Sequence, residues 1–188
     1  MIKKGILLLI FVTLLMLPMT VQAKTTYRYV TKTEDMKEQP KKKAKTIEKL
    51  KCNYKVILIK KGKTWSKIQF AEQFGYVKTN ALHEKRSPKK YPPKYFKRRG
   101  VIRWGGCKWT WYTTKRHPDR RNSLGIKGKH IDKKYGYVLD KDGYICLASS
   151  IRNKKKHLIV PTPFGRYGKV YDTNGKGPSN WRDVYTNW

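Results

Sequence analysis

Short runs of alternating apolar and polar residues dominate the chain after its first two dozen positions, and most are rich in β-branched and aromatic side chains. They are YKVILIKKG, WSKIQF, FGYVKT, YGYVLDKDGYICLAS, HLIVPTPFG, GKVYD and RDVYTNW. Gly, Asn, Asp and Pro separate these runs, which is typical of strands joined by tight turns. Because no run has a convincing helical period, the pattern predicts an all-β fold.

A basic stretch with three prolines, HEKRSPKKYPPKYFKRRG, interrupts these runs between His83 and Gly100. Prolines spaced through a charged stretch are typical of a connection between folded units. We therefore expect a linker over residues 85–99. The two flanking segments, 24–84 and 100–188, are each long enough for one small core, and we expect each to form a β-barrel.

The first 23 residues have the layout of a secretory signal peptide. Lys3 and Lys4 precede an apolar run from Ile6 to Leu17, and the small-residue site Val21-Gln22-Ala23 follows. The alternative is an uncleaved anchor, although the run is shorter than the ~20 residues of a full membrane span. Either way, we expect the remainder of the chain to be exported.

The chain is strongly basic, with 45 Lys and Arg residues against 12 Asp and Glu and a formal net charge of +33. Such a field recruits polyanions. Charge alone does not choose between nucleic acid, anionic lipid and the teichoic acid or peptidoglycan carboxylates of a bacterial wall. Export argues against genomic nucleic acid, so no specific nucleic-acid partner is expected.

Three cysteines, Cys52, Cys107 and Cys146, allow at most one intramolecular disulfide. Cys107 and Cys146 are the better candidates because both fall in the second predicted unit, and three reduced thiols are the alternative. No CxxC or HxxxH spacing occurs among the cysteines and histidines. We therefore expect no zinc site, and no other metal or cofactor.

The segment TWSKIQF, followed by a turn and FGYVKTNAL, resembles the end of the bacterial SH3-like domain. The residues that carry the resemblance are Trp65, Ile68, Gly75, Tyr76, Val77 and Leu82. The segment YRYVTKTEDMKEQPKKKAK replaces the opening that is usual in that family. The resemblance implies that Trp65 and Tyr76 bind wall peptides; the alternative is that they belong to the core and rim of the barrel.

No glutamate occurs from Lys85 onward, so carboxylate chemistry in the second unit must use one of six aspartates. Four of them lie in turn-like or basic loop segments: Asp119, Asp132, Asp140 and Asp142. Asp172 and Asp183 instead adjoin strand-like residues, KVY before the first and VYTNW after the second. The residues alone leave two interpretations open: a shared cleft, or an Asx-turn at Asp172 and an edge strand at Asp183.

The order GYICLASS, VPTPFGRYGKVYDTNG and WRDVYTNW resembles the six-stranded double-psi β-barrel of the three-aspartate (3D) domain, shared with lytic transglycosylases and rare-lipoprotein-A-type proteins. In those families an Asp-Thr-Gly-Gly element is followed eleven residues later by an Ile-Asp-Leu-Tyr-like strand, and Asp172 and Asp183 have that separation. Ala148-Ser149-Ser150 stands where the family has its first aspartate.

The resemblance implies cleavage of peptidoglycan glycan strands, with Asp183 as the acid–base group and Asp172 tuning it. It also implies substrate contacts by Ser149 and Tyr185. In WGGCKWTWY, Trp109 and Trp111 alternate along one face of a strand. They are candidates for stacking against sugars, and core positions are the alternative.

Three function classes remain open from the sequence. The first is an exported, wall-associated lytic transglycosylase of Gram-positive type, acting as a monomer on glycan strands and wall peptides. The second is a module that binds peptidoglycan or teichoic acid without catalysis. The third is a cationic protein that binds membranes or extracellular nucleic acid, and it ranks last because no amphipathic helix of the membrane-active kind is evident.

Overall fold

The computed structural model describes residues 25–114, 125–150, 156–173, 175 and 177–188. The predicted signal peptide over residues 1–23 lies outside these ranges, and so does Asp119. Within them the chain is mostly β-strand with one short α-helix, so the all-β prediction is confirmed at that level. No helix within the same ranges is long and apolar enough to cross a lipid bilayer.

The first half forms a seven-stranded antiparallel sheet with the order β3-β2-β6-β5-β4-β1-β7. Its elements are β1 (Tyr27–Val30), β2 (Glu34–Lys37), β3 (Thr46–Leu50), β4 (Lys55–Lys60), β5 (Trp65–Phe70), β6 (Gln73–Lys78), η1 (Thr79–Ala81) and β7 (Leu82–His83). The alternation in β5 buries Ser66 and Ile68. A Cβ at Gly75 in β6 would lie 2.6 Å from the Met36 side chain, so glycine is required there for the strands to pack.

The second half forms an eight-stranded mixed sheet. Its elements are α2 (Pro93–Arg99), β8 (Val101–Trp104), β9 (Cys107–Thr113), β10 (His130–Ile131), β11 (Val138–Leu139), β12 (Ile145–Ser149), β13 (Ile159–Pro161), β14 (Tyr167–Thr173) and β15 (Trp181–Thr186). The order is β10-β11-β12-β15-β9-β8, and β14 pairs with both β12 and β13. Two of the pairings, β12 with β14 and β9 with β15, are parallel.

Every residue of β12 is buried, because the strand has a hydrophobic core on each face. Ile145 and Leu147 pack into the first core, which also includes Trp109 and Val184. Cys146 and Ala148 pack into the second, smaller core with Ile126, Val138 and Tyr185.

The three cysteines are free thiols, the second of the two alternatives. Cys107 packs against the first core and Cys146 lies in the second. Opposite faces of the sheet hold the two side chains, which is why no bridge joins them. Burial raises the pKa of the Cys146 thiol to about 12, so it stays protonated and unreactive.

The segment predicted as a linker, residues 85–99, contains ordered and buried parts. Ser87 is buried, and its Oγ accepts a hydrogen bond from the Thr162 amide at 3.0 Å. Residues Pro93–Arg99 form α2, which places Phe96 in the first core. Pro93 at the helix start and Gly100 at its end, with φ 68°, delimit the helix. Its seven residues are too few to show a helical period.

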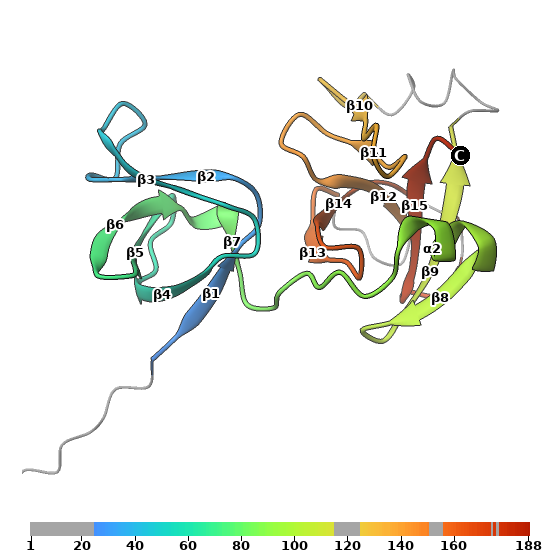
Figure 1. The fold of residues 1–188 in the computed structure, drawn as a ribbon, viewed down its shortest axis with the longest axis horizontal. Coiled ribbons are helices and arrows are strands. Elements are labelled where there is room, and N and C mark those ends of the chain that lie inside the picture. The colour runs from blue at the N-terminus through green and yellow to red at the C-terminus, as the bar shows by residue number, and fades with distance from the viewer. Residues whose placement is uncertain (1–24, 115–124, 151–155, 174, 176) are drawn as a thin grey trace, which may run out of the picture.

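The two sheets lie side by side, joined by the segment after β7 (Figure 1). They are tied by direct contacts. The hydroxyls of Thr31 and Tyr144 lie 2.6 Å apart in a buried hydrogen bond, and Lys32 forms an ion pair with Asp142 at 3.1 Å. The Asn53 side-chain amide also donates to the Gly165 carbonyl at 3.1 Å.

Candidate functional site

Asp172 and Asp183 flank the same residue of β12. Ala148 pairs with Asp172 across the parallel β14 and with Asp183 across the antiparallel β15. A bulge in the β12–β14 register, where the partner shifts from Val170 to Asp172, brings Asp172 into this row. Directly paired residues project from the same face of a sheet. The two carboxylates therefore share one face, two strands apart, or about 10 Å between backbones.

Asp183 is half-buried and has one neutral hydrogen-bond partner. The Thr110 hydroxyl donates to Asp183 Oδ1 at 2.9 Å, and the Trp181 indole Nε1 donates in turn to that hydroxyl oxygen at 2.6 Å. Burial raises the pKa of Asp183, and the Thr110 hydrogen bond lowers it by less. Among the described residues no Lys or Arg forms an ion pair with Asp183, although the chain carries 45 of them.

Asp172 is held by Tyr185. The phenol hydroxyl donates to Asp172 Oδ2 at 2.7 Å, while the Thr173 amide donates to Oδ1 at 2.7 Å. Burial raises the pKa of Tyr185, and its bond to Asp172 and the charges of both aspartates raise it further. Tyr185 therefore stays protonated and lies in the field of both carboxylates. It was predicted as a substrate contact; in the structure it is buried and orients Asp172.

Ser149 lies away from this pair. It is buried, and its hydroxyl accepts a hydrogen bond from Arg182 Nη1 at 2.7 Å. Ser149 pairs with Arg182 of β15. This pair is one position along the strands from the pair formed by Ala148 and Asp183. Strand alternation thus turns Ser149 to the opposite face from the two aspartates.

Trp109 and Trp111 share a face of β9 as predicted, and that face packs against the first core. Trp109 is only 2% exposed, with its Nε1 donating to the Trp104 carbonyl at 3.0 Å. Trp111 is half-buried against Trp188, at 6.2 Å between ring centroids. Both residues therefore occupy core positions, which was the alternative interpretation, and neither lies beside Asp183.

Thr110 and Trp181 complete the surroundings of Asp183, and the sequence did not single out either as a site residue. Alternation along CKWTWYT places Thr110 on the face opposite Trp109, but only the parallel pairing of β9 with β15 sets it beside Asp183. Trp181 is half-buried, with Lys108 Nζ 4.5 Å from its ring centroid.

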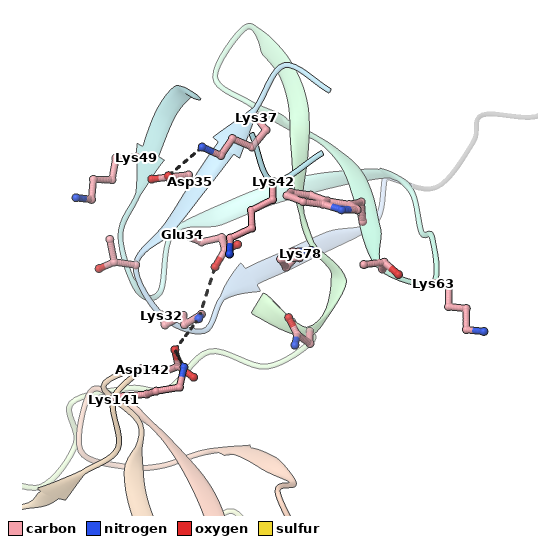
Figure 2. A pocket seen from close by; sticks show the side chains of 14 residues that line it. Lys32, Glu34, Asp35, Lys37, Lys42, Lys49, Lys63, Lys78, Lys141 and Asp142 are labelled. Atoms are coloured by element: carbon pink, nitrogen blue, oxygen red, sulfur yellow. Dashed lines mark hydrogen bonds and ion pairs between the residues drawn. The ribbon is translucent and has the colours of Figure 1, made fainter. Parts of the chain in front are cut away.

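In the first sheet, Trp65 and Tyr76 do not converge on one site. Trp65 lines an open groove whose other lining residues are mostly lysines (Figure 2), and Lys78 Nζ lies 4.0 Å from the centroid of its ring. Tyr76 is half-buried on β6, between Lys67 of β5 and Lys37 of β2. It is not part of the lining of that groove.

No cluster of three or more His, Cys, Asp or Glu side chains suited to a metal ion occurs in the part of the chain that the structure describes. Comparison with protein-family models, with curated proteins and with solved structures gives no match to this chain.

The Thr110 hydroxyl has a measurable effect to test. Because its hydrogen bond lowers the pKa of Asp183, Thr110→Val is expected to raise that pKa. Thr110→Ser keeps the hydroxyl and is expected to leave the pKa near the unmodified value. The ¹³C chemical shift of the Asp183 carboxyl, followed against pH, reports the change. A pKa that stays the same or falls in Thr110→Val would contradict the hydrogen bond from Thr110 to Asp183.

Proposed function

We propose that this chain is an exported, wall-bound protein that cleaves the glycan strands of peptidoglycan as a lytic transglycosylase. The observation that carries the proposal is the environment of Asp183. Its carboxyl group is half-buried, has a raised pKa and has no ion pair with a described cation. A general acid must hold its proton near neutral pH, and burial is one way to achieve this.

The reaction needs a single group that acts first as acid and then as base. Protonated Asp183 gives its proton to the glycosidic oxygen as the bond from that oxygen to the muramic anomeric carbon breaks. The primary hydroxyl of the same muramic residue attacks the anomeric carbon in place of water. Its proton passes to the Asp183 carboxylate, which restores the acid and leaves an anhydro sugar end.

The remaining residues of the site have supporting roles. Thr110 and Trp181 fix the orientation of the Asp183 carboxyl group through successive hydrogen bonds. Asp172, held by Tyr185, places a carboxylate on the same face, where it favours the cationic character that develops at the sugar ring. The two parallel strand pairs, together with the eleven-residue separation of the aspartates, support the double-psi assignment.

Digestion of purified sacculi tests the proposal. The purified protein is expected to release muropeptides that end in anhydromuramic acid, identified by mass spectrometry. Binding to sacculi without anhydro products would overturn catalysis and leave the second function, a wall-binding module. The enclosed position of Ser149, where the resembling family has an aspartate, is the observation that favours this alternative.

A further inference from the structure

Two adjoining cavities form a long depression across the junction of the two sheets. The first, of about 770 Å³, lies on the first sheet, and the second, of about 740 Å³, extends to the edge of the second sheet formed by β10 and β11. They adjoin because Lys32, Thr33, Lys141 and Asp142 line both. We call the two together the lysine groove.

Positive charge exceeds negative charge along the lysine groove. Its cations are Lys32, Lys37, Lys42, Lys49, Lys63, Lys78, Lys133, Lys141 and Arg166, and its acids are Glu34, Asp35, Asp132 and Asp142. Each acid already has a cationic partner within the groove: Glu34 and Asp142 with Lys32, Asp35 with Lys37, and Asp132 with Arg166. The surplus cations are therefore available to an external anion.

Three lysines carry most of this surplus. Lys42, Lys49 and Lys63 are exposed and form no ion pair within the described part of the chain. Figure 2 shows Lys49 and Lys63 on opposite sides of the groove, with Lys42 between them. Charges spread in this way suit an extended polyanion better than one compact ligand.

The junction between the sheets is held in place at the middle of the groove. The Lys32–Asp142 ion pair crosses it at 3.1 Å, next to the buried hydrogen bond between Thr31 and Tyr144. The two ends of the groove are thus fixed relative to each other before a ligand binds, which reduces the entropy cost of binding.

We propose that the lysine groove binds a phosphodiester polymer of the poly(polyol phosphate) type found in wall teichoic acids. Lysine ammonium groups act as point charges for separate phosphates. Single-stranded nucleic acid would also need open aromatic faces for its bases, but the ammonium group of Lys78 lies over the Trp65 ring. The choice of a wall polymer rests on the proposed wall location, whereas the groove itself is independent of Asp183.

Binding of a synthetic poly(glycerol phosphate) oligomer to the purified protein tests this inference. The triple variant K42Q/K49Q/K63Q is expected to bind about tenfold more weakly. The slope of log K against the logarithm of the salt concentration is expected to be smaller in magnitude by about 2. The matched control, K60Q/K94Q/K97Q, removes the same charge from exposed lysines outside both cavities. It is expected to bind within about twofold of the unmodified protein.

Equal losses in the two triple variants would overturn the proposal, because binding would then follow net charge and not the groove. Tighter binding of an oligothymidylate with the same number of phosphates, lost only in the groove variant, would also overturn it and assign the groove to nucleic acid. No cell-wall glycan is present in this assay, so its outcome is separate from that of the sacculus digestion.

Discussion

Replacing Asp183 with Asn is expected to lower the release of anhydro-muropeptides from sacculi by at least about 100-fold, the usual contribution of a general acid–base group. Asn has a similar shape, but its amide is far too weak an acid to protonate the glycosidic oxygen. Because the groove lysines and the first sheet are unchanged, binding to sacculi is expected to persist. Product release and pelleting with sacculi, measured on the same samples, separate the two effects.

Asp183→Asn is expected to lower the activity but to stabilise the folded chain, relative to the unmodified protein, as the pH rises. Burial raises the pKa of Asp183 above 3.8, so the folded chain holds this proton more tightly than the unfolded chain does. The contribution of Asp183 to the free energy of unfolding is greatest below the pKa that this group has in the unfolded chain. It is lost as the pH rises through the pKa that the group has in the folded chain. Asn carries no charge at any pH, so the unfolding midpoint of Asp183→Asn, relative to that of the unmodified protein, is expected to rise as the pH increases through the folded pKa of Asp183.

Glu72→Gln is the matched control, because it removes one carboxylate from an exposed turn of the first sheet. It is expected to change neither product release nor the unfolding midpoint. If Asp183→Asn kept its activity, Asp183 would not be the acid–base group. Lower activity combined with a lower unfolding midpoint would instead indicate a structural role for the carboxyl group.

Much of the first sheet was predictable because its pairings are local. The alternation in WSKIQF and the glycine of FGYVKT define β5 and β6, which are neighbours in sequence and pair directly. The Asp140 turn was predictable for the same reason. Its carboxylate accepts hydrogen bonds from the Asp142 and Tyr144 amides, as an Asx-turn does.

The candidate site was predictable only in part. The sequence pointed to Asp172 and Asp183, and the structure places them on one face beside Ala148. Thr110 was not identified as a partner of Asp183, because β9 and β15 are far apart in sequence and their parallel pairing leaves no local signal. Alternation also cannot tell which face of a strand is enclosed, and for this reason Trp109 was considered both for the core and for sugar contact.

Phe96→Ala is expected to destabilise the second sheet by about 3–5 kcal/mol, the usual cost of truncating a buried aromatic side chain to alanine. Phe96 is 0% exposed and stacks on Phe164, at 4.8 Å between ring centroids, and it forms a T-shaped pair with Trp188 at 6.5 Å between ring centroids. Truncation would leave a cavity beside the rings of Phe164 and Trp188, which the rest of the first core holds in place. The free energy of unfolding from urea titration measures the loss.

Tyr95 provides the matched control on the same helix. It is 36% exposed, and among the described residues its ring stacks only on Tyr91, so Tyr95→Ala is expected to cost about 1 kcal/mol. Five of the six tryptophans lie after residue 100, so tryptophan fluorescence reports mainly on the second sheet. Equal, small losses in the two variants would mean that residues 85–99 connect the sheets without belonging to the core. A large loss in Phe96→Ala alone would make α2 part of the second folded unit, whose boundary then lies before residue 96.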